Sequence, residues 1–339
     1  MAGMLPSLGL GQRVLVTGGT GFIGRHLVAT LLSRGARVRV LARNPGTIPA
    51  EWAAVEIRRG ELEDAASLTA ACQGVDTVFH AAGYAHAWAD DSAQAATRHW
   101  RVNAEGTRRS AQAAGAAGAS CFVFLSSVKA MGEPGERCVD ESWSLPPATP
   151  YGQAKRAAET WVLEAGQHYG MRVVNLRLAL VYGPGGKGNL ERMAAAIRRG
   201  WFPPLPEVGN RRSLVHAADV AQAALLAAEQ PAADGRTYIV TDGQYYSSRE
   251  LYDLIRRGLG KAPTRLAVPA AALRALARTG DLLNRLGHRR LGFDSEALDK
   301  LLGWACYRCD RIQQELGYRP RWTLAEALPA LFSGTPGWP

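Results

Sequence analysis

Residues 17–24 read Thr-Gly-Gly-Thr-Gly-Phe-Ile-Gly, and this glycine-rich segment constrains the fold more than any other feature of the chain. An apolar run at 14–16 precedes it, and a helical pattern with leucines at 27, 31 and 32 follows it. Glycines let the backbone turn tightly and approach a pyrophosphate, whose charge is met by the free N–H groups at the start of the helix. A strand, this loop and a helix in succession therefore predict a dinucleotide-binding site. Its expected contacts are Gly18, Gly21, Phe22, Ile23 and Gly24.

Short apolar runs alternate with helical stretches through the first half of the chain, at 38–41, 77–79, 121–125 and 173–176. Because brief buried strands joined by helices need cover on both faces of their sheet, this pattern predicts an α/β fold with a doubly wound parallel sheet. After Pro184 the chain changes to Gly/Pro-rich turns and basic helices, which indicates a smaller C-terminal substrate-binding lobe. We expect a dinucleotide-binding domain over residues 1–182 with returning segments at about 212–243, and the lobe over 183–211 and 244–339.

The net charge of +10 comes mostly from arginines that stand singly or in pairs, without a basic block. This pattern favours solvated helix faces, so we expect no nucleic-acid partner. The chain has no run of about 18 apolar residues and no secretory signal pattern at its start, so we expect a cytoplasmic protein without a transmembrane segment. The five scattered cysteines are expected to be reduced thiols, and Cys306 and Cys309 alone offer too few ligands for a metal site.

The stretch 273–290 is rich in arginine and leucine. Its apolar positions predict an amphipathic helix that packs its leucines inward, namely Leu273, Leu276, Leu282, Leu283 and Leu286. Two alternatives stay open, in which the arginines close over a diphosphate or rest on an anionic membrane. These arginines are Arg274, Arg278, Arg285, Arg289 and Arg290.

Tyr151 and Lys155 stand four residues apart at the start of a predicted helix, so their side chains share one face. A phenol with its ordinary pKa of about 10 is a poor base at neutral pH, but a neighbouring ammonium and a cationic nicotinamide ring favour the phenolate. Tyr151 can then exchange a proton with a carbinol or carbonyl oxygen while hydride moves to or from the cofactor. Ser127 follows the apolar run 121–125, at the strand end where α/β sheets place ligands, and is expected to hydrogen-bond the same oxygen. These three residues are the predicted catalytic group.

The residue after the second apolar run indicates which nicotinamide cofactor is bound. NAD-preferring proteins place an acidic side chain there to receive the ribose hydroxyls, whereas this chain has Ala42 and Arg43. Because a guanidinium suits a 2′-phosphate, Arg43 favours NADP(H), with NAD(H) as the alternative.

Together these residues resemble the extended short-chain dehydrogenase/reductases, also called the NAD-dependent epimerase/dehydratase family, over almost the whole chain. Further matches are the segments 60–62 (Gly-Glu-Leu), 81–83 (Ala-Ala-Gly), 103–107 (Asn-Ala-Glu-Gly-Thr) and 182–184 (Tyr-Gly-Pro). The resemblance implies a Rossmann-type fold and a homodimer formed through a four-helix contact that includes the Tyr151 helix. It also implies that Tyr151 and Lys155 contact the cofactor, together with Glu61, Leu62, Ala81, Ala82 and Gly83.

The second lobe resembles the nucleotide-sugar branch of that family. By this resemblance Asn189 contacts the sugar nucleotide, Arg212 its diphosphate, and Ser127 the reacting sugar. The segment 125–133 is most similar to UDP-4-keto-6-deoxy-hexosamine 4-reductases and UDP-N-acetylhexosamine 4-epimerases of bacterial polysaccharide biosynthesis. Leu180 stands where galactose-type epimerases have Asn, which disfavours a self-contained epimerase.

The resemblance therefore implies an NADP(H)-dependent reductase or dehydrogenase that acts at C4 of a nucleotide sugar, with UDP as the expected nucleotide. An NAD-dependent UDP-hexose or UDP-hexosamine 4-epimerase and a hydroxysteroid- or dihydroflavonol-type dehydrogenase are the alternatives. A catalytically silent NADP-sensing regulator would lack one of the three catalytic residues, and all three are present. Nearby, His216 is expected to be a packed strand residue and Asp219 to cap a helix that begins at Val220.

Overall fold

The computed structural model describes residues 11–44, 48–49, 52–84, 93–186, 188–286 and 293–332. Its centre is a parallel sheet in the order β10-β7-β5-β4-β1-β2-β3. Strand order reverses between β1 and β4, and α/β sheets bind ligands at the carboxyl ends of their strands beside such a point. The bounds of the strands are β1 Arg13–Thr17, β2 Arg37–Ala42, β3 Glu56–Arg59, β4 Thr77–His80, β5 Cys121–Ser127, β7 Arg172–Leu178 and β10 Arg236–Val240. This architecture confirms the predicted doubly wound α/β fold.

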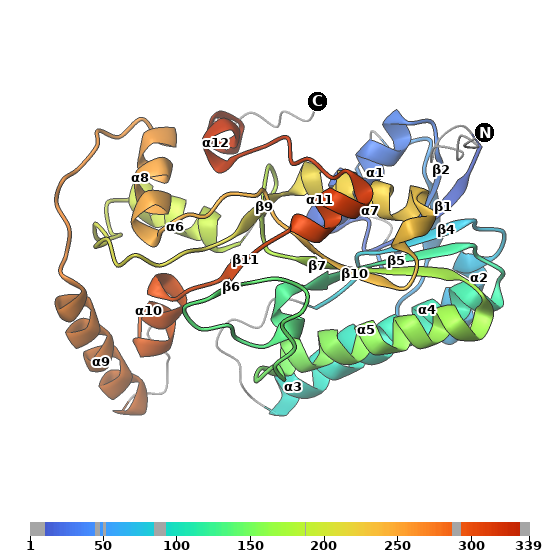
Figure 1. Cartoon of the computed structure of the whole chain (residues 1–339), viewed down its shortest axis with the longest axis horizontal. Coiled ribbons are helices and arrows are strands. Elements are labelled where there is room, and N and C mark those ends of the chain that lie inside the picture. Colours follow the sequence, from blue (N-terminus) through green and yellow to red (C-terminus); the bar gives the residue numbers. More distant parts are fainter. Residues whose placement is uncertain are drawn as a thin grey trace.

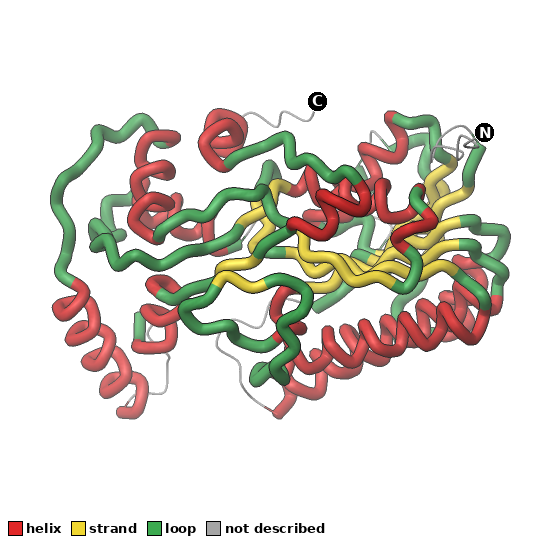
Figure 2. Tube along the Cα trace, viewed as in Figure 1, coloured by secondary structure: helices red, strands yellow, loops and turns green. Residues whose placement is uncertain are grey.

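Helices cover both faces of the sheet, as Figures 1 and 2 show. One face carries α1 (Phe22–Ser33), α7 (Ala217–Glu229) and α11 (Asp310–Leu316), and the other carries α2 (Ala65–Cys72), α4 (Gly106–Ala116) and α5 (Pro150–Tyr169). Each face has its own buried apolar cluster, one around Leu27, Val123 and Tyr238 and one around Phe122, Phe124 and Val162. Because both faces are covered, the central strand β5 is buried along its length, as an apolar run such as 121–125 predicts.

A second apolar core lies beyond the sheet, around Tyr182, Leu254 and Leu324. It is enclosed by α6 (Asn189–Arg198), α8 (Ser248–Gly258), α9 (Ala270–Leu286), α10 (Ser295–Leu302) and α12 (Leu324–Phe332), and Figure 1 shows α9 at the outer edge of this group. Two short parallel strand pairs connect the two regions, β8 (Leu180–Tyr182) with β9 (Leu214–His216) and β6 (Cys138–Val139) with β11 (Cys306–Tyr307). The remaining elements are α3 (Ala93–His99), the π-helical segment Trp100–Glu105 and the 3-10 turns Val128–Met131 and Pro231–Ala233.

A disulfide joins Cys138 of β6 to Cys306 of β11, with a Cα–Cα distance of 4.5 Å. The expectation that all five cysteines are reduced is therefore wrong. Cys309 is a free, buried thiol whose sulfur accepts a hydrogen bond from Thr241. The bridge ties β6, in the segment after Ser127, to β11, which follows α10, and so links chain segments 168 residues apart.

The carboxylate of Asp219 does not cap α7. That helix begins at Ala217, and its N-cap is His216, whose Nδ1 accepts from the backbone N–H of Ala218. Asp219 instead accepts hydrogen bonds from the backbone N–H groups of Arg321 and Trp322, and so fixes the C-terminal segment to α7. His216 is buried at the end of β9, as expected for a packed strand residue.

Helix α9 differs from the predicted inward packing of its leucines. Leu273 and Ala277 are buried, whereas Leu276, Leu282 and Leu283 are more than half exposed. Arg289 and Arg290, and the side chains of Arg285 and Leu286, lie outside the described residues. Among the described helices none is both long and apolar enough to cross a bilayer.

Candidate active site

The glycine loop between β1 and α1 has no room for side chains at Gly18 and Gly24. Gly18 has a φ of +72°, and a Cβ there would lie 2.6 Å from the backbone of Ala82. A Cβ on Gly24 would lie 2.1 Å from the carbonyl oxygen of Gly18, so the first turn of α1 can pack against the loop only with glycine. No side chain caps α1 at Gly21, which leaves its first N–H groups available for an anion.

His80 at the end of β4 ties this loop to the neighbouring strand. The Oγ1 of Thr17 lies 2.7 Å from His80 Nδ1, and His80 Nε2 lies 3.0 Å from Thr107 Oγ1. Since Thr107 donates its own proton to the Asn103 carbonyl, the neutral imidazole must donate from Nε2 and accept from Thr17 at Nδ1. Burial lowers the pKa of His80 to about 3, so it stays neutral and acts as a fixed link in the framework.

A cleft of about 230 Å³ opens at the carboxyl ends of β1, β2 and β4. Among the predicted cofactor residues its lining includes Gly18, Gly21, Arg43, Glu61, Leu62, Ala81, Ala82 and Gly83. Phe22, Ile23 and Gly24 stand in the first turn of α1, directly behind it. The glycine cradle, the open helix end and this cleft fit a dinucleotide.

The cleft also has lining residues that the sequence analysis missed. Arg98 lies with its guanidinium carbon 4.1 Å from the centre of the Tyr84 ring, and both residues line the cleft beside Arg43. Asn103 fixes Tyr84 by accepting from its N–H at 2.7 Å and donating to its carbonyl at 2.8 Å. Only their positions in the sequence could have indicated these two residues as cofactor contacts. Tyr84 directly follows the 81–83 segment, and Arg98 precedes Asn103 on a helical stretch.

Tyr151 is held at the start of α5 by the local sequence. Thr149 is the N-cap, its Oγ1 accepting from the Gly152 N–H at 3.2 Å, and Pro150 is the first helical residue. A Cβ at Gly152 would lie 2.5 Å from the carbonyl oxygen of Lys129, so this glycine lets α5 approach the loop after Ser127. As a result the Tyr151 and Ser127 side chains are hydrogen-bonded to each other.

Burial raises the pKa of Tyr151, and the hydrogen bond from Ser127 opposes that rise. Lys155 lies on the same buried face, but its Nζ donates to the Leu125 carbonyl at 2.9 Å. Burial therefore has the larger effect on the pKa of Tyr151, and the expectation that Lys155 and a nicotinamide ring together favour the phenolate stays a prediction. In this state the phenol is protonated at neutral pH and suited to act as an acid.

Lys155 is itself in an unusual environment for a cation, at 5% exposure with its Nζ 4.5 Å from the centre of the Phe124 ring. Burial lowers the pKa of Lys155 to about 8, and the carboxylate of Glu159, one helical turn later, raises it. Glu159 thus keeps a proton on Lys155 at neutral pH.

Glu159 is held by a buried network that connects three elements. Arg177 of β7 donates to its two carboxylate oxygens at 2.7 to 3.2 Å, and Ser126 of β5 donates at 2.6 Å. Both charged side chains are almost fully buried. This network fixes α5, and with it Tyr151 and Lys155, against the carboxyl ends of β5 and β7.

A larger cavity of about 720 Å³ lies between α6, α8, α9 and α10. It is adjacent to the catalytic edge, because Leu178 is the register partner of Ser127 and Leu180, two residues later, lines the cavity. Leucine, phenylalanine, methionine and tryptophan side chains form most of its wall, including Met193, Phe202 and Leu251.

The two predicted substrate residues, Asn189 and Arg212, both line this cavity. The Oδ1 of Asn189 is buried and has no hydrogen-bond partner among the described residues. One guanidinium nitrogen of Arg212 donates to the carbonyls of Lys300 and Gly303 at 2.8 and 3.0 Å, so it also holds the end of α10. Burial lowers the pKa of Arg212 from its usual value.

Residues 14–241 match the NAD dependent epimerase/dehydratase family. Two relatives are similar over most of their length. A 4-hydroxy-2-methyl-3-oxo-4-farnesyl-3,4-dihydroquinoline-1-oxide ketoreductase of Stigmatella aurantiaca is 32% identical, and the match covers 96% of this chain and 97% of that protein. A 3 beta-hydroxysteroid dehydrogenase/Delta 5-->4-isomerase of Mycobacterium tuberculosis is 29% identical, and the match covers 93% of this chain and 88% of that protein. The structure of Thermus thermophilus UDP-glucose 4-epimerase in complex with NAD superposes with a TM-score of 0.71 at 26% identity, covering 94% of this chain and 97% of that one. The glycine cradle, the nucleotide cleft and the matched sequence agree, and the chain belongs to the NAD-dependent epimerase/dehydratase family of extended short-chain dehydrogenases, whose members are NAD(P)-dependent enzymes.

Proposed function

We propose that the protein is an NADP(H)-dependent ketoreductase whose substrate has a large apolar body. This proposal rests on the apolar lining of the 720 Å³ cavity. Apart from Gly280, its lining residues are apolar except for Asn189, Arg192, Arg212, Ser248, Thr279 and Lys300. Such a wall favours hydrocarbon, since burial of apolar surface contributes about 25 cal/mol per Å². The names of the two relatives, a hydroxysteroid dehydrogenase and a ketoreductase of a farnesyl-bearing compound, point the same way.

In this proposal the carbonyl end of the substrate reaches the catalytic edge while its body lies in the cavity. When bound, the nicotinamide cofactor supplies the hydride. Tyr151 donates its proton to the substrate oxygen as negative charge develops there, and Ser127 stabilises that charge by a hydrogen bond. Lys155, kept protonated by Glu159, favours the resulting tyrosinate electrostatically.

The proposed preference for NADP(H) is supported by the charges in the cofactor cleft. Arg43 and Arg98 both line it, and the second strand ends in Ala42 without a carboxylate. Arg43 is exposed and forms no ion pair with another described residue, so its guanidinium is available for a 2′-phosphate.

A nucleotide sugar is the second candidate substrate, and a specific observation favours it. Asn189 places an unpartnered buried oxygen in the cavity wall, and Arg192, Arg212 and Lys300 bring positive charge to the same wall. A diphosphate would use these groups, and the reaction would then be reduction or epimerisation at C4 of the sugar. We rank it second because a polar nucleotide offers no apolar surface for the leucines of α9 to bury, namely Leu273, Leu276 and Leu283.

The test measures NADPH consumption with three classes of carbonyl substrate: a long-chain alkyl ketone, a ketosteroid and a UDP-4-keto-6-deoxy sugar. We expect NADPH consumption with one of the first two, and consumption with the UDP sugar alone would refute the proposal. Tyr151→Phe should lower kcat by about 10²- to 10⁴-fold while NADPH binding is retained, because it removes only the proton donor. The matched control is Tyr169→Phe at the other end of α5, which should keep the wild-type rate.

A further inference from the structure

The outer face of α9 carries leucines that the protein does not bury. Leu273, Ala277 and Gly280 form the inward stripe of this helix, at the spacing expected for one packed face. Leu276 and Leu283 are 58% and 54% exposed although they also line the cavity, so they stand at its rim. Leucines at such a rim make the mouth of the cavity apolar.

Two further segments bring apolar side chains to the same region. Trp201, after α6, lines the cavity and is 83% exposed. Leu266 is 74% exposed and belongs to the strap 261–269, the extended connection between α8 and α9 that Figure 1 shows at the edge of the molecule. Large exposed apolar groups at the cavity opening, from α9 and from the segment after α6, together with Leu266 on the neighbouring strap indicate an interaction surface.

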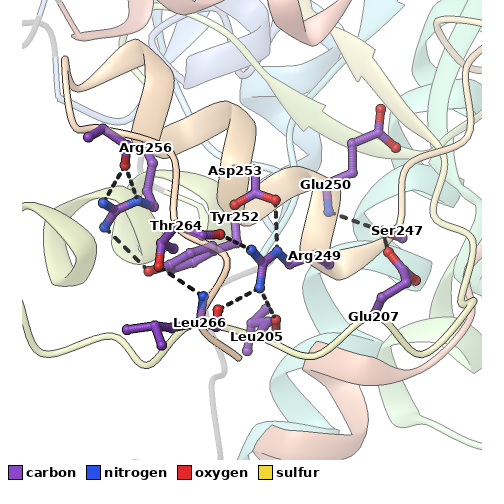
Figure 3. Close-up of polar contacts among 11 residues, drawn as sticks. Leu205, Glu207, Ser247, Arg249, Glu250, Tyr252, Asp253, Arg256, Thr264 and Leu266 are labelled. Carbon is purple, nitrogen blue, oxygen red and sulfur yellow. Dashed lines mark hydrogen bonds and ion pairs between the residues drawn. The ribbon is translucent and has the colours of Figure 1, made fainter. Parts of the chain in front are cut away.

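The strap is held in a fixed position by arginines of α8, as Figure 3 shows. Arg249 donates to the backbone carbonyls of Thr264 and Leu266 on the strap and of Leu205 on the cavity wall. Arg256 donates to the carbonyl of Ala262. These bonds fix the strap against α8, and Leu266 on the strap is exposed.

The charge around these apolar groups is positive. Arg265, Arg274 and Arg278 are exposed on the strap and on α9, and none forms an ion pair with another described residue. The acidic residue of the helix, Asp281, is turned inward and accepts hydrogen bonds from the backbone N–H and hydroxyl of Ser295. A second copy of this face would bring like charges together, whereas anionic lipid headgroups complement them.

We propose that α9 and the strap form a docking surface for an anionic lipid bilayer, with the exposed leucines and Trp201 inserted among the headgroups and the arginines bound to them. The cavity then opens toward the membrane. Docking depends only on this surface, whereas delivery of a lipophilic substrate from the bilayer rests on the proposed function.

Vesicle flotation tests the docking. The full chain should float with vesicles of phosphatidylcholine containing a quarter phosphatidylglycerol, and at least fivefold less protein should float with pure phosphatidylcholine. Arg274→Glu/Arg278→Glu should lower binding to the anionic vesicles at least tenfold, since each basic residue near such a surface contributes about fivefold in affinity. The control is Arg37→Glu/Arg236→Glu, which changes the exposed first residues of β2 and β10. Its binding to the anionic vesicles should be within twofold of the wild type.

Leu276→Glu/Leu283→Glu should abolish flotation with either vesicle, and Leu145→Glu, an exposed leucine away from this helix, should float like the wild type. Equal flotation by the α9 variants and the wild type would overturn the proposal, as would a wild type that floats with neither vesicle. A wild-type dimer that these leucine substitutions split, without vesicle binding, would also overturn it and make the face a contact between copies.

Failure of the docking and failure of the proposed function give different results. Turnover of a short water-soluble ketone with NADPH, in buffer without vesicles, reports only on the reductase chemistry. Arg274→Glu/Arg278→Glu should keep that rate within twofold, because neither arginine lines the cleft or the cavity. A protein that floats with anionic vesicles but reduces no ketone would support the docking and refute the reductase.

Discussion

Replacing Glu159 with glutamine tests whether a buried ion pair positions the catalytic lysine. The substitution keeps the size of the side chain but removes its negative charge. Arg177 would then be left as a buried guanidinium that has lost its carboxylate partner, and Lys155 would lose the charge that raises its pKa.

The expected loss of stability follows from the burial of the pair. Removing one partner of a buried ion pair typically costs about 3–5 kcal/mol, because the remaining charge is desolvated without compensation. The exposed pair of Lys129 and Glu133 is the matched control, and Glu133→Gln should change stability by at most about 1 kcal/mol. Urea unfolding of the three proteins measures both values. Adding Arg177→Met to Glu159→Gln should recover part of the loss, since the guanidinium that lost its carboxylate partner is then removed as well.

The effect on catalysis has a defined sign. The pKa of Lys155 is already lowered to about 8 by burial, and loss of the Glu159 carboxylate lowers it further. Lys155 then deprotonates at a lower pH, so the alkaline fall in kcat/KM for ketone reduction should shift toward neutral pH in Glu159→Gln. The double variant should keep this shifted profile even where its stability is recovered. A single variant that unfolds within 1 kcal/mol of the wild type, or that keeps the wild-type pH profile, would refute the reasoning.

Two further predictions concern the cofactor and the disulfide. Arg43→Ala should raise the KM for NADPH roughly tenfold to a hundredfold, because a hydrogen bond to a charged group contributes about 1.5–3 kcal/mol, and should change the KM for NADH by no more than about twofold. Equal changes in the steady-state KM for both cofactors would contradict the role of Arg43. Arg37→Ala is the control. Thiol titration of the unreduced, denatured protein should find the three free cysteines. Cys138→Ser should lower the free energy of unfolding by up to about 5 kcal/mol in the oxidised protein, because the bridge closes a 168-residue loop, and an unchanged urea midpoint would count against that bridge.

The parts of the fold that the sequence predicted are those with a local signal. Apolar runs identified β1, β2, β4, β5 and β7, the returning segment expected at about 212–243 contains β10, and the glycine loop marked the turn between β1 and α1. The edge strand β3 was missed because its sequence, Glu-Ile-Arg-Arg, has one partly buried residue and three exposed ones. A strand that packs on one side only, at the edge of a sheet, lacks the apolar run that marks a central strand.

Contacts between distant segments had no such signal. Glu159 and Arg177 lie 18 residues apart on different elements, and their pairing becomes visible only when α5 packs on β7. The disulfide, likewise, needs β6 and β11 side by side. The cavity is assembled from segments between Leu180 and Leu301, so its apolar character is a sum over single side chains that no motif describes.

The leucines of α9 lie on more than one side of the helix, so their spacing does not predict a single buried face. At about 100° per residue, Leu282 lies about 180° around the helix from the buried Leu273. One packing partner cannot cover two opposite sides of a helix, so an inward orientation of every leucine was excluded by the spacing itself. The structure buries the side of Leu273 against the second core and leaves the side of Leu282 exposed next to Arg278. A helix with leucines on opposite sides and arginines between them is suited to two apolar environments at once, which are the interior of the lobe and, in our proposal, the surface of a membrane.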